Sequence, residues 1–378
     1  MIEKEKDLRA LLAILPAHVM SVCQTLHRHG YEAFIVGGAL RNYFLGKAIG
    51  EIDLATNARP DQVMTIFKRV KATGVRYGTV TVFFEGKTGA YHDGVEVTTY
   101  RSESVYSDSR HPDSIQFETT IEADLKRRDF TMNALAFDPV SLREVDLFGG
   151  RRDIQLRVLR CVGKPELRFQ EDSLRLFRAC RFQAEYPLKL DAPMVAAGRR
   201  VSQSVLFPSA ERIYVELKKL MSGSFPEKGW RALKKMGVLR RLDSMLDSQA
   251  EELFDGLSSY QDVSLRWAFI LQHTDAGQFL RRNRFSKKEG AWIARLIRFN
   301  LDIEHARLSV KDLAVSGKDL MALGLSGRQI GKVQRMLLDA LRRGGVLNDK
   351  ASLLSHFKLA YNRVDEIDMI DEEGLTGG

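Results

Sequence analysis

The chain has 378 residues, 28% of them charged and 44% hydrophobic, so we expect a soluble globular protein of two or more domains. Its polar first residues and the lack of an apolar run of about 18–20 residues argue against a secretory signal and a membrane span. Cys23, Cys161 and Cys180 show no paired spacing, which disfavours a disulfide framework and a cysteine zinc site and indicates a reducing cytoplasm. The net charge of +9 favours a polyanionic partner.

The first 138 residues have the pattern of a small α+β domain. Residues 1–30 show helical spacing of apolar side chains, and Pro16 is expected to divide this segment because proline suits a first helical turn. A helix is predicted from Pro60 through Val70. Short strand-like runs, which would form one mixed sheet, cover 34–36, 52–55, 80–84, 95–99, 115–117 and 134–137.

The character of the chain changes after Asp138-Pro139. From about residue 165 helical periodicity dominates, strand signals are nearly absent, and glycines punctuate the helices. Basic clusters recur in this half, which favours a large nucleic acid as partner; they occupy 234–235, 240–241, 281–284, 287–288 and 342–343.

A glycine turn and a pair of acids stand out within residues 33–56. Gly37-Gly38 ends one apolar run, and Glu51 and Asp53 lie in the next. On a strand these carboxylates would share one face, roughly 6–7 Å apart. Glycines admit phosphate oxygens close to backbone N–H groups, and carboxylates are ligands for Mg²⁺. An ordinary turn beside solvated acids is the alternative.

A third carboxylate is a candidate for the same place. The alternation in GVEVTTYR puts Glu96 and Thr98 on one strand face. A neighbouring strand would bring Glu96 to the Glu51 and Asp53 pair, although an exposed strand acid explains it equally well.

Two basic segments are further candidates. In 125–134, LKRRDFTMNA, Arg128 suits phosphate, and Asp129 and Asn133 suit sugar hydroxyls or bracing of the turn, with a solvated basic turn as the alternative.

In 171–182, EDSLRLFRACRF, helical spacing puts Asp172, Arg175 and Arg178 on one face, with Arg181 beside the apolar side. A helical salt bridge between Asp172 and Arg175 is one interpretation, but it leaves Arg178 and Arg181 unexplained. In the alternative, Asp172 and Arg175 together hydrogen-bond the edge of a base.

These segments identify a resemblance. The segments GGALRN, EIDLAT, VEVTTYRSE, YSDSRHPDSIQF, LKRRDFTMNA, DLFGGRRDI, EDSLRLFRACRF and SAERIYVEL occur in this order over residues 33–220. Together they closely resemble the bacterial class II tRNA nucleotidyltransferases, which are the CCA-adding enzymes and their poly(A) polymerase relatives. The helical remainder is similar more loosely, mainly through DLMALGLSGRQIGKVQRML.

The resemblance implies a seahorse-like α+β protein with a polymerase β-type head and an all-α remainder. The expected domains are a catalytic head at 1–138, a neck at 139–205, a body at 206–300 and a tRNA-binding tail at 301–378. It implies that Gly37, Gly38 and Arg41 contact the triphosphate, that Glu51 and Asp53 hold two Mg²⁺ ions, and that Arg128 contacts phosphate or ribose. Asp172 and Arg175 would read the base of CTP or ATP, braced by Arg178 and Arg181.

The activity that this implies is template-independent addition of CMP, CMP and AMP to the tRNA 3′ end with release of pyrophosphate. An A-adding enzyme and a poly(A) polymerase stay open as alternatives, as does a catalytically dead tRNA-binding protein. A CC-adding enzyme is disfavoured because the segment between Glu96 and Lys126 is intact, including 110–112. Glu51 and Asn42 stand where the family usually has aspartate, which bears on rate. We expect a cytoplasmic monomer or weak dimer.

Overall fold

The computed structural model describes residues 7–83, 94–103 and 115–360. The chain divides into two compact units, residues 1–258 and 259–378. Residues 110–112, on which the argument against a CC-adding enzyme partly depends, lie outside the described residues. Across the described part of the chain, no helix combines the length and apolar character needed to span a membrane.

The first unit opens with two helices, α1 (Leu8–Leu12) and α2 (Ala17–Arg28). Pro16 is the N-cap of α2, so the predicted division of this segment is confirmed. α2 then packs its apolar face, which includes Val22 and Leu26, into the core.

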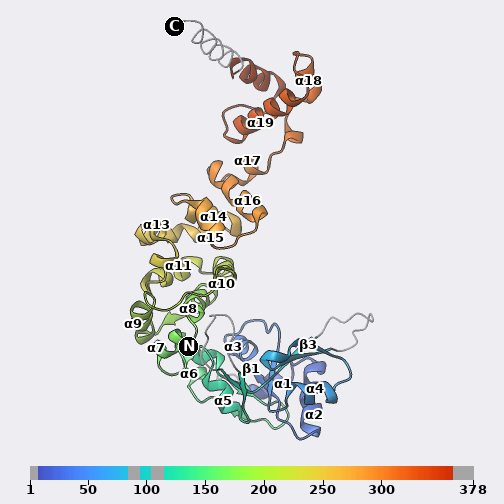
Figure 1. The fold of residues 1–378 in the computed structure, drawn as a ribbon, viewed down its shortest axis with the longest axis vertical. Helices are drawn as coiled ribbons and strands as arrows, with labels where there is room; N and C mark the ends of the chain where they lie inside the picture. Colours follow the sequence, from blue (N-terminus) through green and yellow to red (C-terminus); the bar gives the residue numbers. More distant parts are fainter. Residues whose placement is uncertain (1–6, 84–93, 104–114, 361–378) are drawn as a thin grey trace, which may run out of the picture. The chain divides into compact units, whose positions relative to one another are not determined.

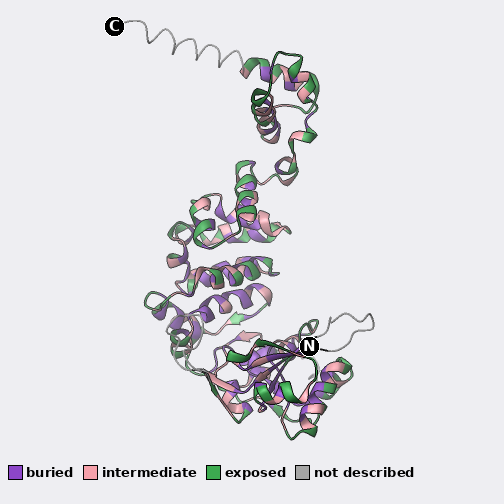
Figure 2. Ribbon diagram, turned by 45° about the vertical axis from the view of Figure 1, so that its right-hand side comes forward, coloured by how far each residue is buried: buried purple, intermediate pink, exposed green. Residues whose placement is uncertain are grey.

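A seven-stranded mixed sheet lies at the centre of the N-terminal part of this unit (Figure 1). β1 pairs antiparallel with β2 and β8, whereas β2 and β5 run parallel, so the predicted mixed sheet is confirmed. The expectation that 115–117 joins this sheet is wrong, because that strand pairs in a separate two-stranded sheet. Buried residues gather along its central strands (Figure 2). The strands in sheet order are β3 (Val70–Gly74), β4 (Thr79–Phe83), β5 (Gly94–Thr99), β2 (Asp53–Thr56), β1 (Phe34–Val36), β8 (Ala136–Phe137) and β9 (Glu144–Val145).

The predicted helix through Val70 is wrong beyond residue 66. α4 spans Pro60–Ile66, and Phe67 already has extended backbone angles, φ −105° and ψ 128°. Val70 and Lys71 pair instead with Val82 and Thr81 of β4. Cross-strand pairing of β-branched residues therefore overrides the helical pattern that extends past Ile66.

Smaller elements connect the sheet to the helices. β6 (Arg101–Glu103) pairs antiparallel with β7 (Ile115–Phe117), and β10 (Val158–Leu159) pairs parallel with β11 (Lys189–Leu190). The short helices beside the sheet are α3 (Gly38–Phe44), η1 (Val75–Tyr77), α5 (Ile121–Lys126), η2 (Thr131–Asn133) and α6 (Gly150–Gln155).

The rest of the first unit is mainly helical, as predicted, although the short strands β9, β10 and β11 lie within the part expected to be all-α. α8 (Leu174–Glu185) lies against α10 (Ala210–Ser222) and α11 (Pro226–Lys235), and it buries Leu176, Phe177 and Cys180. The other helices here are α7 (Pro165–Glu171), α9 (Ala192–Val201), α12 (Leu239–Leu242) and α13 (Ser244–Ser248), followed by η3 (Glu251–Ser259).

The second unit is built from helices over its described residues. Its last part has its own core, in which Leu320, Leu337 and Leu353 are fully buried. Residues 350–360 are helical. The earlier elements are α14 (Val263–Leu271), α15 (Ala276–Arg282), α16 (Lys287–Arg298), α17 (Ile303–Arg307), η4 (Val310–Asp312), α18 (Gly317–Met321) and α19 (Arg328–Arg342).

Candidate active site

The glycine turn lies where β1 gives way to α3. Gly37 has φ +66°, a conformation that favours glycine. A Cβ atom at Gly37 would also lie 3.0 Å from Nη1 of Arg128. Val36, the residue before the turn, pairs with Asp53 across β1 and β2. Backbone conformation and strand register therefore bring together the turn, Asp53 and Arg128.

The two predicted metal carboxylates are placed differently from each other. Both side chains are exposed, but Asp53 begins β2 and lines a pocket, whereas Glu51 lies on the segment before the strand. The prediction that one strand carries both is wrong, because the ladder with β1 ends at the pair Val36–Asp53. Partial burial raises the pKa of Asp53, Arg128 opposes this, and Glu51 adds to it. Glu51 is therefore electrostatically close to Asp53.

Glu96 approaches the same acids through the parallel pairing of β2 and β5. Leu54 pairs with Val97, so the preceding residues Asp53 and Glu96 are neighbours. Partial burial raises the pKa of Glu96, and the charges of Asp53 and Glu51 raise it further. The expected third carboxylate is thus near the other two, although it does not line the pocket.

The three carboxylates are compatible with a divalent cation. Glu51 raises the pKa of Asp53, and both of these acids raise the pKa of Glu96, so a bound cation would relieve this repulsion. Carboxylate oxygens are also the ligands that Mg²⁺ prefers. Within the described ranges, however, no group of three or more His, Cys, Asp or Glu side chains is arranged to hold a metal ion.

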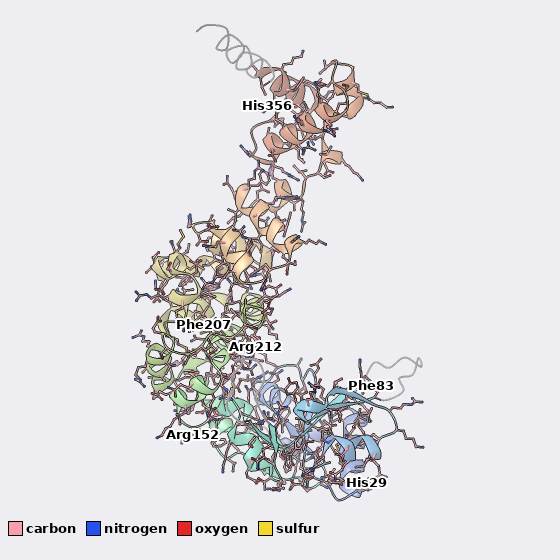
Figure 3. All side chains as sticks on the ribbon, viewed as in Figure 1. His29, Phe83, Arg152, Phe207, Arg212 and His356 are labelled. Carbon is pink, nitrogen blue, oxygen red and sulfur yellow. The ribbon has the colours of Figure 1, made fainter. Side chains whose placement is uncertain are left out.

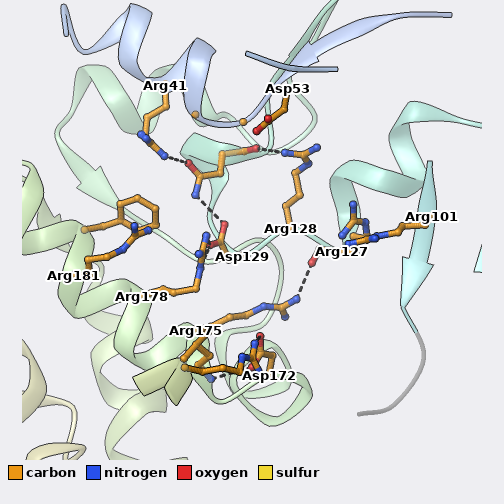
Figure 4. Close-up of a pocket in the computed structure, with 16 residues that line it drawn as sticks. Arg41, Asp53, Arg101, Arg127, Arg128, Asp129, Asp172, Arg175, Arg178 and Arg181 are labelled. Atoms are coloured by element: carbon orange, nitrogen blue, oxygen red, sulfur yellow. Dashed lines mark hydrogen bonds and ion pairs between the residues drawn. The ribbon is translucent and has the colours of Figure 1, made fainter. Parts of the chain in front are cut away.

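A pocket of about 490 Å³ opens beside Asp53 (Figure 4). Arginine dominates its lining, with eight arginines against three aspartates. An anion is therefore the ligand that this pocket favours. The lining residues are Gly37, Gly38, Arg41, Asp53, Arg101, Arg127, Arg128, Asp129, Asn133, Asp172, Leu174, Arg175, Arg178, Arg181, Phe182 and Arg212.

Asp129 and Asn133 brace the floor of the pocket. Asn133 donates from Nδ2 to Oδ1 of Asp129 at 2.9 Å, and Arg178 donates from Nε to Oδ2 at 2.7 Å. Burial opposes the charge of Asp129, but Arg178 and the bond from Asn133 outweigh it and hold its pKa well below the usual range. Of the two predicted roles for these residues, bracing is the one the contacts display.

Arg41 and Arg128 are held over this floor from opposite sides (Figure 4). Arg41 donates to Oδ1 of Asn133 at 2.8 Å, and Arg128 donates to its backbone oxygen at 3.2 Å. Arg128 also pairs with the buried Asp124, at 3.0 Å between Nη2 and Oδ2. Both guanidinium groups are therefore positioned before any ligand is present.

The predicted continuous helix through Asp172 is wrong. α7 ends at Glu171, and the carboxylate of Asp172 accepts from the backbone N of Leu174 at 3.0 Å, so that a new helix begins. Asp172 also accepts from Arg212 at 3.1 Å. Asp172 and Arg175 both line the pocket, but they reach it from a break between helices and not from one helical face.

Arg175 is buried and held by other groups. It donates to Oε2 of Glu171 at 2.8 Å and to the backbone oxygens of Arg127 at 2.8 Å and Arg168 at 3.1 Å. Arg175 thus forms its salt bridge with Glu171 and not with Asp172, the partner that helical spacing suggests.

Arg178 and Arg181 also line the pocket. Arg181 pairs with the buried Glu216 of α10, at 2.9 Å between Nε and Oε2. Its guanidinium lies 4.1 Å from the ring centre of Phe182. Arg181 is thus fixed between α8 and α10.

Eleven of the thirteen predicted site residues line the pocket; Glu51 and Glu96 do not. The lining also includes Arg127, which belongs to the predicted basic segment 125–134 but was not among the predicted site residues, and Arg101 and Arg212, which were not predicted at all. Arg212, labelled in Figure 3, comes from α10. The segment SAERIYVEL contains it, but nothing in that local pattern indicates its partner 40 residues earlier.

Comparisons with known proteins agree with this architecture. Residues 33–160 match the family described as "Poly A polymerase head domain", and residues 188–249 match "Probable RNA and SrmB- binding site of polymerase A". The chain is similar to the Bacillus stearothermophilus CCA-adding enzyme solved in complex with CTP. The TM-score is 0.68 at 28% identity, covering 96% of this chain and 100% of that one. The fold also matches a Thermotoga maritima CCA-adding enzyme complexed with tRNA, with a TM-score of 0.64 at 18% identity.

Curated relatives extend the similarity along most of the sequence. The CCA-adding enzyme of Bacillus pumilus is 31% identical over 89% of this chain and 95% of its own length. That of Ligilactobacillus salivarius is 31% identical over 95% of this chain and 87% of its own length. With sequence, fold and an arginine-lined pocket in agreement, the chain belongs to the CCA-adding enzyme family of nucleotidyltransferases.

Proposed function

We propose that this protein adds CMP, CMP and AMP from CTP and ATP to the 3′ end of tRNA. The observation that carries the proposal is the pocket in which eight arginines surround a glycine turn and Asp53. A triphosphate needs concentrated positive charge and backbone N–H groups, and both occur here. The names of the relatives and the CTP complex of the Bacillus stearothermophilus enzyme support the choice of reaction.

The side chains have distinct roles in this proposal. Arg41, Arg128 and the Gly37-Gly38 turn hold the triphosphate, and Arg178 and Arg181 brace the wall beside it. The 3′-hydroxyl oxygen of the tRNA bonds to the α-phosphorus, the bond from that phosphorus to the bridging oxygen breaks, and pyrophosphate leaves. The hydroxyl proton passes to water. Holding both reactants in line is the main contribution of the protein.

We infer that magnesium binds beside the pocket, at the acids that neighbour Asp53. Glu51 and Asp53 would hold two Mg²⁺ ions, with Glu96 as a third carboxylate beside them. When bound, the ions supply positive charge that activates the hydroxyl and stabilises the leaving pyrophosphate.

Base selection is assigned to Asp172 and Arg175. The three contacts of Arg175 use three of the five N–H donors of a guanidinium, which leaves two for a base edge. Asp172 accepts one bond on each oxygen, and a carboxylate has about four acceptor positions. Both side chains therefore have capacity for a base while their present partners hold them in place.

The test is incorporation of labelled CMP and AMP into tRNA that lacks its CCA end. We expect Asp53→Asn to lower the rate about a thousandfold, since about 4 kcal/mol of charge stabilisation would be lost. Asp61→Asn, an exposed aspartate of α4 outside the pocket, is the matched control and should keep the wild-type rate.

Sequencing the product ends separates the activities of the family. Ends reading CCA with both nucleotides support the proposal. Addition of A only to tRNA ending in CC would indicate an A-adding enzyme, and long A tracts a poly(A) polymerase. Absence of incorporation despite tRNA binding would indicate a binding protein without activity.

A further inference from the structure

Tyr186 lies behind the pocket and contacts one of its arginines. It is the residue after α8, it is 7% exposed, and it is not among the lining residues. Its hydroxyl accepts a hydrogen bond from Nη2 of Arg41 at 3.0 Å and donates to Oδ1 of Asn42 at 2.9 Å. A guanidinium cannot accept a hydrogen bond, so the hydroxyl proton of Tyr186 must point to Asn42.

Arg41 is held entirely by neutral oxygens among the described residues. Besides Tyr186, it donates to Oδ1 of Asn133 at 2.8 Å, and to Oδ1 of Asn42 at 3.2 Å from Nε and 3.1 Å from Nη2. The rings of Phe182 and Tyr186 each lie 5.1 Å from its guanidinium carbon. Neutral acceptors fix the direction of the guanidinium and leave its positive charge available to a ligand. A carboxylate partner would instead neutralise that charge.

The same bonds join the middle and the C-terminal end of α8 to the sheet side of the pocket. Arg178, within α8, bonds to Asp129, which accepts from Asn133. Asn133 accepts from Arg41, and Arg41 donates to Tyr186 just beyond the end of α8. A shift of α8 would therefore alter the support of Arg41.

We propose that Tyr186 is a positioning residue for Arg41 and so sets the affinity of the pocket for the triphosphate part of the nucleotide. This inference rests on the proposed function, because it requires Arg41 to bind triphosphate. Tyr186 does not touch the nucleotide. Through Tyr186, the position of Arg41 depends on α8, the helix that carries the base-selecting Arg175.

The test compares Tyr186→Phe with wild type. This change keeps the ring beside Phe182, at 6.2 Å between centroids, and removes only the hydroxyl. We expect roughly tenfold weaker equilibrium binding of both CTP and inorganic tripolyphosphate, because a hydrogen bond to a charged group is lost. KM for CTP should rise by a similar factor while kcat stays within about twofold.

Tyr100→Phe is the matched control. Tyr100 is also buried, and its hydroxyl donates to Oε2 of Glu32 at 3.0 Å, away from Arg41. We expect it to lose comparable stability and to bind tripolyphosphate like wild type. A purely structural effect of Tyr186→Phe would lower stability in the same way and leave both affinities unchanged.

A second background shows whether the effect passes through Arg41. Lysine keeps the charge at position 41 but lacks the forked donors, so Tyr186→Phe should have little further effect on Arg41→Lys. Equal affinities of Tyr186→Phe and wild type would overturn the inference, as would an undiminished tenfold loss in the Arg41→Lys background. A wild-type protein that binds neither CTP nor tripolyphosphate would overturn the proposed function as well, which distinguishes the two failures.

Discussion

At the scale of single residues, Asp124 shows how one buried charge organises two arginines. Its side chain is 1% exposed, and its two oxygens accept from Arg127 at 2.7 Å and Arg128 at 3.0 Å. Burial opposes ionisation, but Arg128 and Arg127 outweigh it and hold the pKa of Asp124 below its usual value. Arg128 then reaches the pocket with its direction already set.

Asp124→Asn should therefore destabilise the protein. Two guanidinium groups would lose their shared counter-charge, for which we expect a loss of about 3 kcal/mol in the free energy of unfolding. Denaturant titration at pH 7 measures this. Asp61→Asn, which changes an exposed aspartate in the same way, should shift stability by less than about 0.5 kcal/mol.

The pH dependence gives an independent check on Asp124. A carboxyl whose pKa is lowered by folding stabilises the protein above its unfolded pKa of about 3.9, and this stability is lost as pH falls through the lowered value. Wild type should thus lose part of its advantage over Asp124→Asn below about pH 4. Parallel stability curves for the two proteins down to pH 2.5 would contradict the assigned role.

Which residues meet in the site was predictable only in part. The GG turn, Asp53 and the arginines of the two basic segments carry strong local patterns, and the pocket gathers them. The partners Asp172–Arg212 and Arg41–Tyr186 lie 40 and 145 residues apart, and they depend on how helices pack. Such pairs have no signature in a single sequence.

At the scale of elements, the close approach of two backbone segments explains why glycine stands at position 223, directly after α10. The spacing of residues in the sequence does not explain this glycine. A Cβ atom at Gly223, after α10, would lie 2.5 Å from the backbone oxygen of Ala184 in α8. Phe225, two residues later, donates its backbone N–H to that same oxygen at 2.8 Å. The turn after α10 is therefore pressed onto the base-selecting helix.

Gly223→Ala should destabilise the first unit by about 1–3 kcal/mol, because the clash is with backbone and cannot be relieved by a rotamer change. Gly290→Ala is the control of opposite sign. Gly290 is inside α16, and a Cβ atom there would meet Leu280 only at 4.0 Å, so we expect a gain of about 0.5–1 kcal/mol. Denaturant titration measures the free energy of unfolding of both variants. An unchanged value for Gly223→Ala would show that the backbone at this contact can move to accept a methyl group.

The wrong element boundaries share a cause. In the sequence, helical periodicity continues through Asp172 and past Ile66. In the structure, α7 ends before Asp172 and α4 ends at Ile66. In one case the side chain of Asp172 accepts from the backbone N of Leu174 at the start of a new helix, and in the other the backbone pairs with a neighbouring strand. Tertiary partners decide both, so periodicity predicted the elements but not where they end.

At the scale of the whole molecule, the change from a mixed sheet to helices was predictable because hydrophobic periodicity differs between the two halves. The four predicted domains stay a prediction, as do the cytoplasmic location and the oligomeric state. The chain forms two compact units that divide after Ser258. The net charge of +9 applies to the entire chain, so its meaning depends on where the exposed basic residues lie.

The proposed tRNA substrate makes that distribution testable. Arg281, Lys287 and Lys288 are exposed at the end of α15 and the start of α16. If they contact phosphates, changing all three to glutamine should weaken tRNA binding and reduce the slope of log K against log salt by about 2–3, since each contact releases roughly 0.7–0.9 counterions. Affinity for CTP should not change, because these residues lie outside the nucleotide pocket.

A charge-matched variant separates a binding track from the effect of net charge. Lys68, Lys71 and Arg76 are exposed in and beside β3, and their change to glutamine removes the same three charges. We expect this variant to keep the wild-type salt slope, because a counterion is released only where a phosphate is contacted. Equal reductions in both variants would mean that overall charge and not the α15–α16 residues attracts the RNA. An unchanged slope in both would place the tRNA contacts elsewhere on the protein.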